Sequence, residues 1–373
     1  MNKNLKIAII LLVCALIFGI ILANKNKTKK NNTPGVLKIG AILPLSGDLT
    51  YVGEEMRRGM EMALDDTKEK NVKIVYEDDL TFDIKASVNA ASKLVNSDHV
   101  DVLLNSVVDT IKGVAPILNQ KKVPGVVIWD SNKTINNLGD YVFGMGLSTE
   151  HAGEDMADLA YNKLGLRHIS IVSNFNEWSE IISIAFKNEF TKLGGTIDYH
   201  ERVEINTNDV RVNLAKIKSK QSQGIYFPLY NPSLSSLIKQ AKNLGFKGYL
   251  FTGDVLTDAD IKVLGKNVEG IYTTQAYLNS PEFLKKYKQK YGQEVPATNL
   301  AFAGLGYDTV NFLLAIKNEL VSQKIPVNSQ TIRDHIINFE YNGVTGKTIF
   351  SPQRITDKRE AILQVQNGAL VKP

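Results

Sequence analysis

Cysteine is almost absent from this chain, since Cys14 is the only one among 373 residues. It lies in an apolar stretch near the N-terminus, so the rest of the chain has no thiol nucleophile and no disulfide. The five histidines are scattered, and none pairs with another at the spacing of metal ligands. A G-x-S-x-G nucleophile elbow is missing as well. We therefore expect a protein that is not an enzyme and that needs no metal or cofactor.

One glycine-rich segment could be mistaken for a phosphate-binding loop. Residues 343–348 read GVTGKT, which is two residues too short between its glycines. The segment also precedes the apolar pair Ile349-Phe350 instead of opening a helix. The sequence therefore predicts a turn here.

Excess charge of one sign is confined to the N-terminus. The chain carries a formal net charge of +5, but six of its 44 Lys and Arg residues lie in the first 35 positions, where there is no Asp or Glu. The remainder has 38 basic against 39 acidic residues. A nearly neutral domain gives no indication of a nucleic-acid partner.

The one long apolar run covers residues 7–23 and is flanked by lysines. As a helix it would be about 26 Å long, close to the ~30 Å of a bilayer core. Three interpretations remain open: an uncleaved anchor, which we favour, a cleaved signal peptide, or lipidation at Cys14. The sequence Ile21-Leu22-Ala23-Asn24 is a poor cleavage site. In each interpretation the rest of the chain is exported. Residues 24–35, which are rich in Asn and Lys, would form a solvated tether to it.

Beyond the tether, apolar segments of two kinds alternate. Candidate strands are Val72–Tyr76, Val100–Leu104, Val126–Trp129, Ile169–Ser173, Gly224–Phe227 and Tyr249–Thr252. Between them lie segments with helical spacing, such as 182–190 and 234–244. This alternation predicts an α/β fold with parallel sheets covered by helices, and the 338 residues after position 35 are enough for two lobes.

The segment from Val36 to Gly59 is the most informative. An apolar strand runs to Leu43, breaks at Pro44 and turns at Ser46-Gly47, and a helix is expected after Gly53. Ligands of open α/β sheets bind at the carboxyl ends of the strands. We therefore expect this loop to face a binding site.

Several segments in a fixed order resemble one family. After the opening strand come Tyr76–Asp79, Val114-Ala115-Pro116 with Lys122-Val123-Pro124, Asn174–Trp178, and Gln240–Phe246 followed by Gly253-Asp254. In this order and spacing they resemble the type I periplasmic binding proteins, the branched-chain amino-acid-binding (Leu/Ile/Val-binding-like) receptors of ABC transporters. The resemblance covers most of the exported chain.

The resemblance implies a fold and a mechanism. Two Rossmann-like lobes, residues 36–147 plus 275–350 and residues 148–274 plus 351–373, would be joined by three crossing segments. The crossings are expected near 147–148, 273–275 and 350–352. The lobes would close over a small polar ligand by hinge motion, and the closed monomer would dock on the membrane permease of an ABC transporter.

The resemblance also implies roles for individual residues. Asp254 occupies the place of the acidic residue that holds a ligand's ammonium group. Trp178 and Tyr230 correspond to aromatic walls of the cleft. The competing interpretations are that Asp254 caps a helix beginning near Thr257 and that Trp178 fills the core.

The chain departs from the family in the first-lobe loop that holds a ligand's carboxylate. The key serine position corresponds to Val108, with Ser106 before it and Asp109 beside it. A second anchor falls on Ser131, which keeps a hydroxyl, and Tyr51 lies next to the position of the opening-loop aromatic.

We therefore expect contacts from Asp254, Trp178, Tyr230, Ser131, Asp109, Ser106 and Tyr51. Because Asp109 and Asp130 would repel an anion, the ligand could be an amino acid, an amide or an amine. The alternative function is a ligand-free interaction or sensory module of the same fold in the cell envelope.

Overall fold

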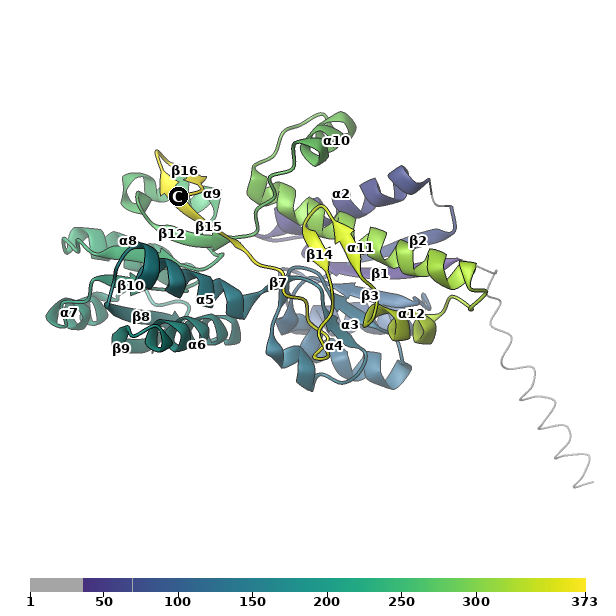
Figure 1. The fold of residues 1–373 in the computed structure, drawn as a ribbon, viewed down its shortest axis with the longest axis horizontal. Coiled ribbons are helices and arrows are strands. Elements are labelled where there is room, and N and C mark those ends of the chain that lie inside the picture. Colours follow the sequence, from purple (N-terminus) through teal and green to yellow (C-terminus); the bar gives the residue numbers. More distant parts are fainter. Residues whose placement is uncertain (1–35, 69) are drawn as a thin grey trace, which may run out of the picture.

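The computed structural model describes residues 36–68 and 70–373. The predicted anchor over residues 1–23 and the tether over residues 24–35 lie outside the described residues. The remaining chain forms two α/β lobes that lie side by side (Figure 1).

A five-stranded parallel sheet forms the first lobe, in the order β2-β1-β3-β4-β6. Its strands are β1 (Leu37–Leu43), β2 (Val72–Asp78), β3 (Val102–Asn105), β4 (Gly125–Val127) and β6 (Val142–Gly144). The predicted strands at 72–76, 100–104 and 126–129 are confirmed to within two residues at each end. Apart from β2, which lies at the sheet's edge, these strands are mostly buried, because helices cover both faces of the sheet.

Helices of the first lobe come from two distant parts of the chain. They are α2 (Thr50–Thr67), α3 (Ile84–Asn96), α4 (Val108–Lys121) and the 3₁₀ turn η1 (Lys133–Asn137), then α10 (Pro281–Tyr291), α11 (Ala297–Ser322) and α12 (Ser329–Ile336). The helix expected after Gly53 begins earlier, at Thr50, so Gly53 lies within it. A side chain at Gly53 would overlap the carbonyl of Pro44, which explains why a glycine stands inside the helix.

The helix α11 has the length and composition of a membrane span, and no other helix of the described residues does. Of its apolar 18-residue window 78% is buried, and the helix packs along α2, where Gly59 and Gly306 let the two backbones approach closely. Figure 1 shows α2 and α11 lying together over the first sheet. The helix is therefore a core element of the first lobe.

The second lobe repeats the strand order of the first. Its sheet has the order β9-β8-β10-β11-β12, all parallel, extended by the antiparallel strands β15 and β16. The strands are β8 (His168–Asn174), β9 (Thr196–Val203), β10 (Gly224–Tyr226), β11 (Tyr249–Thr252), β12 (Tyr272–Gln275), β15 (Ala361–Gln366) and β16 (Ala369–Val371). The helices are α5 (Thr149–Asp158), η2 (Leu159–Lys163), α6 (Glu177–Lys192), α7 (Arg211–Ser219), α8 (Ser233–Asn243), α9 (Asp258–Leu264) and η3 (Gly265–Val268).

Three segments run between the sheets. The first passes through β7 (Leu147–Ser148), which pairs with β5 (Asp130–Ser131), into α5, and the second follows β12. The third stays beside the first lobe beyond the expected 350–352, because Ile355 and Lys358 still pair with Gly144 and Leu147. It then runs into β15 (yellow in Figure 1).

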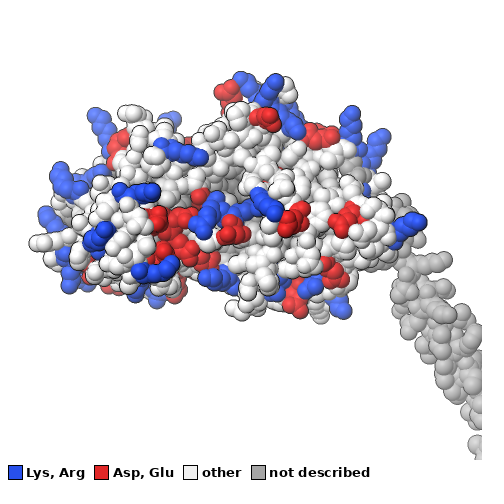
Figure 2. All heavy atoms as spheres, in the orientation of Figure 1, with Lys and Arg blue, Asp and Glu red and all other residues white. Residues whose placement is uncertain are grey.

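Charged side chains gather where this third segment meets α5. Figure 2 shows acidic residues over α5, which carries Glu150, Glu154, Asp155 and Asp158. Arg359 of the third segment pairs with Asp155. The contact ties the segment to the second lobe at the point where it leaves the first.

The glycine-rich segment 343–348 forms a hairpin, as the sequence predicts. Strands β13 (Tyr341–Gly343) and β14 (Gly346–Thr348) flank its two-residue turn. The buried carboxylate of Asp308 accepts hydrogen bonds from the backbone N–H groups of Val344 and Thr345, at 2.9 and 2.8 Å. The N–H groups of Val344 and Thr345 are therefore bonded within the lobe, as in a structural turn.

Candidate functional site

A cavity of about 730 Å³ lies between the two lobes. Most of its walls come from residues just beyond the carboxyl ends of parallel strands, including Phe82 after β2, Asp130 after β4, Tyr230 after β10 and Asp254 after β11. Strand carboxyl ends are where open α/β sheets bind ligands, and the volume is that of a small-molecule site. This cleft is the candidate functional site.

Aromatic rings line both sides of the cleft. On the first lobe, the ring of Trp129 lies 4.8 Å from Phe302 and 5.8 Å from Phe82, between ring centroids. On the second lobe, the rings of Trp178 and Tyr230 lie 5.1 Å apart. A ligand between the lobes would therefore meet π faces and ring edges from both directions.

Asp254 lies at the base of the cleft, two residues after β11. Burial raises the pKa of its carboxyl group to about 6, while polar interactions with Glu360, Trp178 and Trp129 oppose this rise. Asp254 does not cap α9, because Thr257 and Asp260 form the capping box of that helix. The competing structural interpretation of Asp254 is therefore wrong.

Asp130 and Asp109 add two further carboxyl groups from the first lobe. The Oδ1 atom of Asp130 accepts a hydrogen bond of 2.8 Å from the backbone N–H of Val108, the first residue of α4. Burial raises the pKa of Asp130 to about 8, and the nearby charges of Asp109 and Asp254 act in the same direction. Asp109 lies 3.3 Å from the ammonium group of Lys112.

Glu360 approaches Asp254 from the third crossing segment. Burial raises its pKa well above the ordinary value, and the negative charge of Asp254 adds to the effect. Its Oε2 atom is buried and has no hydrogen-bond partner in the described chain. A neutral Glu360 can donate a hydrogen bond to an ionised Asp254, so the two carboxyl groups share one negative charge.

Five of the seven predicted site residues line the cleft: Asp254, Trp178, Tyr230, Asp109 and Tyr51. Ser106 and Ser131 do not, because both are buried within the first lobe. The hydroxyl of Ser106 donates to Asp79 at 2.8 Å, and that of Ser131 to the carbonyl of Gly144 at 3.4 Å.

Sequence reasoning missed other cleft residues. Trp129 ends the predicted strand at 126–129, so the rule that ligands bind at the carboxyl ends of strands could have indicated it. Phe302 comes from the second turn of α11, and Glu360, which interacts with Asp254, comes from the third crossing segment. Neither has a local signal in the sequence.

At one rim of the cleft the lobes touch directly. Glu177, at the start of α6, pairs with Lys112 of α4, and it accepts a hydrogen bond of 2.7 Å from the hydroxyl of Thr134. Both partners belong to the first lobe. Glu177 adjoins Trp178, so this contact lies beside an aromatic wall of the cleft.

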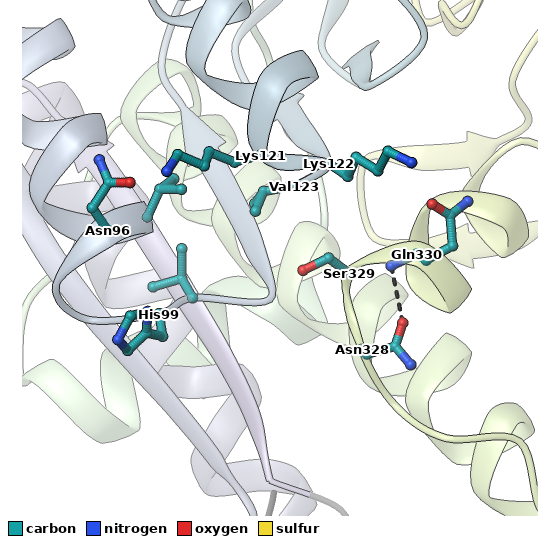
Figure 3. A pocket seen from close by; sticks show the side chains of 10 residues that line it. Asn96, His99, Lys121, Lys122, Val123, Asn328, Ser329 and Gln330 are labelled. Carbon is teal, nitrogen blue, oxygen red and sulfur yellow. Dashed lines mark hydrogen bonds between the residues drawn. The ribbon is translucent and has the colours of Figure 1, made fainter. Parts of the chain in front are cut away.

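A second depression of about 500 Å³ lies on the first lobe alone (Figure 3). Lys121 and Lys122 stand opposite the start of α12, where the side chain of Asn328 already accepts a hydrogen bond from Gln330 N–H, at 3.0 Å. This depression is away from the strand carboxyl ends and the second lobe. Over residues 36–68 and 70–373, no group of three or more His, Cys, Asp or Glu side chains could hold a metal.

Comparisons with known proteins agree with this architecture. The chain is 29% identical over 295 residues to the Leu/Ile/Val-binding protein homolog 6 of Brucella suis, covering 74% of this chain and 75% of that protein. A leucine-binding protein LivK of Thermotoga maritima is 26% identical, with a TM-score of 0.77 over 91% of this chain and 98% of that one.

Another solved structure, a Rhodopseudomonas palustris solute-binding protein in complex with 4-hydroxybenzoate, shares the fold. It is 20% identical, with a TM-score of 0.77 over 91% of this chain and 95% of that one. The model of the periplasmic binding protein family matches residues 36–369. The chain therefore belongs to the periplasmic binding protein family.

Proposed function

We propose that this protein is the extracytoplasmic solute-binding component of an ABC-type uptake system. Its two lobes close over a small polar ligand, which is an amino acid, an amide or an amine. The observation that carries the proposal is the interlobe cleft in which Asp254 lies between Trp129 and Trp178. Family members are solute-binding proteins, which supports binding rather than catalysis as the task of this cleft.

The protein would act as a monomer at the outer face of the cell membrane. The apolar run at residues 7–23 would hold it there, and the closed form would dock on a membrane permease. The names of similar proteins support the permease partner, because some are described as solute-binding or substrate-binding proteins of ABC transporters.

A thermal-shift screen tests this function directly. The full chain, purified in a non-ionic detergent, is heated with millimolar amino acids, amides and amines. A ligand that binds only the folded protein raises Tm by mass action, by an amount that grows with concentration. We expect at least one ligand to raise Tm, and Asp254→Ala to abolish the rise. If no compound of the three classes raises Tm, the ligand-free module replaces the solute-binding proposal.

A further inference from the structure

The charge of the cleft has one sign. Among the described residues that line it, six are aspartates and none is Lys, Arg or His. They are Asp48, Asp109, Asp130, Asp254, Asp258 and Asp260. The nearby Lys112 is already paired with Asp109 and Glu177. Because low-dielectric walls strengthen the field inside a cleft, this arrangement attracts cations and repels anions.

The N-terminus of α4 would be the natural position for a ligand's anionic group. Helix N-termini bind anions through their free N–H groups and the positive end of the helix dipole. In α4, however, the Val108 N–H is already bonded to Asp130, 2.8 Å away, and Asp109 lies in the first turn. The chain's own carboxylate therefore occupies the place that a ligand's carboxylate would need.

Two other helices that begin at the cleft, α6 and α9, have N-termini that are already capped. In α6 the side chain of Asn176 accepts a hydrogen bond from Ser179 N–H, at 2.9 Å, and the first turn carries two glutamates. In α9 the hydroxyl of Thr257 accepts one from Asp260 N–H, at 3.1 Å, and the first turn carries two aspartates. Both N-termini are capped and surrounded by negative charge.

The remaining surface of the cleft suits a ligand that has an apolar carbon skeleton and a cationic group. Rings from both lobes face it, namely Tyr51, Phe82, Trp129, Trp178, Tyr230 and Phe302. An ammonium group over such rings is attracted by their π faces, and its carbon chain buries apolar area against them. The rings and the carboxylates are interleaved, since Asp254 interacts with the indoles of both Trp129 and Trp178.

We propose that the ligand is an organic amine without a carboxylate, whose ammonium group lies between Asp254 and Asp130 and whose carbon skeleton packs against the rings of both lobes. This inference rests on the proposed function and narrows it to one ligand class. Amino acids are disfavoured because the described lining of the cleft offers their carboxylate no basic side chain, and because Asp130 already bonds the first N–H of α4. Amides are disfavoured because they leave the carboxylates without a compensating charge.

The raised pKa values of the carboxyl groups at the cleft are consistent with a cationic ligand. Burial raises the pKa values of Asp130, Asp254 and Glu360, and repulsion by neighbouring carboxylates adds to the rise at Asp130 and Glu360. The buried Oε2 atom of Glu360 also lacks a partner. A bound cation would supply the missing charge compensation and release protons from these groups.

Matched ligand pairs test the inference. Leucine is compared with 3-methylbutylamine, phenylalanine with phenethylamine, and lysine with 1,5-diaminopentane, since each pair differs by one carboxylate. Titration calorimetry on the full chain, together with tryptophan fluorescence, measures Kd. We expect an amine to bind at least tenfold more tightly than its parent amino acid in one or more pairs.

The outcomes separate the inference from the function on which it rests. If an amino acid binds as tightly as its amine in every pair, or only amides bind, the carboxylate-free ligand is refuted while solute binding stands. If no amine, amide or amino acid binds at millimolar concentration, both proposals fall.

Two substitutions at Asp130 test whether this residue causes the preference for an amine over its parent amino acid. Asp130→Ser removes the carboxylate and frees the Val108 N–H, so the preference for amine over amino acid should fall at least tenfold. Asp130→Asn keeps an oxygen acceptor for Val108 N–H, so it should weaken amine binding without improving amino-acid binding. Asp209→Asn, on the exposed surface of the second lobe, is the matched control for lost charge. An unchanged preference in a folded Asp130→Ser protein contradicts the role given to Asp130.

Discussion

The Oδ1 atom of Asp130 lies 2.8 Å from the backbone nitrogen of Val108, and this contact joins the residues that follow two neighbouring strands. Asp130 also begins β5, whose partner β7 leads into the first crossing to the second lobe. The same side chain thus contributes charge to the cleft, fills the N-terminus of α4 and borders a connection between the lobes.

Loss of the Asp254 carboxylate should strongly weaken ligand binding. Removing one partner of a desolvated charge pair costs about 2–5 kcal/mol, roughly a 30-fold to several-thousand-fold rise in Kd. Asp254→Ala should therefore raise Kd for any ligand found in the screen by this factor. Because the two tryptophans of the chain, Trp129 and Trp178, both interact with Asp254, their fluorescence provides the titration signal.

Asp254→Asn separates charge from hydrogen bonding at the same position. A loss close to that of the alanine variant indicates a cationic ligand, whereas a loss of a few-fold indicates an amide or hydroxyl group. Asp209→Asn should leave Kd unchanged. A Kd that stays constant in both Asp254 variants, with native circular dichroism, would remove Asp254 from the site.

Amine binding should become stronger as pH rises from about 5.5 to 8.5. The raised pKa values, about 6 for Asp254 and about 8 for Asp130, mean that these groups are partly protonated over this range. A cation favours their ionised forms, so affinity should increase by up to about tenfold per pH unit for each carboxyl that must lose its proton. The carboxyl groups that act on Asp130 are those of Asp109, Asp254 and Glu360, and Lys112 pairs with Asp109.

Calorimetry in two buffers of different ionisation enthalpy measures the released protons. Asp130→Asn should flatten the upper part of the pH profile and reduce proton release.

The free energy of unfolding of the ligand-free protein should show the opposite trend with pH, because a raised folded-state pKa means that stability is lost as pH rises from about 4 to 8. Affinity that is independent of pH across the range would contradict this account of the cleft.

Closure of the two lobes should depend on Glu177, which pairs with Lys112 and accepts a hydrogen bond from Thr134 across the rim of the cleft. Partly exposed ion pairs contribute about 0.2–1 kcal/mol, so Glu177→Gln should speed ligand dissociation by roughly 1.5- to 5-fold. Stopped-flow fluorescence measures this rate, and the effect should shrink in high salt. Glu180→Gln is the control, because Glu180 lies on the same helix but pairs with Arg202 of its own lobe.

The contact between α2 and α11 should tolerate no side chain at Gly306. A methyl group there would overlap the carbonyl of Met56, and two backbones cannot separate locally. We expect Gly306→Ala to lower the free energy of unfolding by about 1–3 kcal/mol. In Gly304→Ala the new methyl meets side-chain atoms of Leu278, Thr345 and Val344 and no backbone, so that variant should be less destabilised than Gly306→Ala. Denaturant unfolding of both variants distinguishes the two contacts.

Local patterns were enough to predict the strands. Apolar runs bounded by turns identified strands such as β8, β10 and β11, because burial on both faces selects continuous apolar sequence. The family resemblance implied Asp254, Trp178 and Tyr230 as site residues, and all three line the cleft. The order of these segments also sufficed to predict the family.

The start of α2 was harder to predict than its existence. A glycine is an ordinary signal for a turn, but Gly53 lies inside the helix. The residue there is a glycine because Pro44 approaches too closely for any side chain. Close approach between segments is a tertiary property, and no periodicity in the sequence records it.

The sequence by itself determined the alternation of strands and helices, the family and the acidic character of the strand-end loops, since these depend on neighbouring residues. Only the tertiary structure decided which side chains share the cleft. Ser106 and Ser131 turn inward to partners within their own lobe, whereas Phe302 and Glu360 arrive from distant segments. It likewise decided that Asp130 occupies the N-terminus of α4, because a hydrogen bond between residues 22 positions apart depends on how β4 lies beside β3.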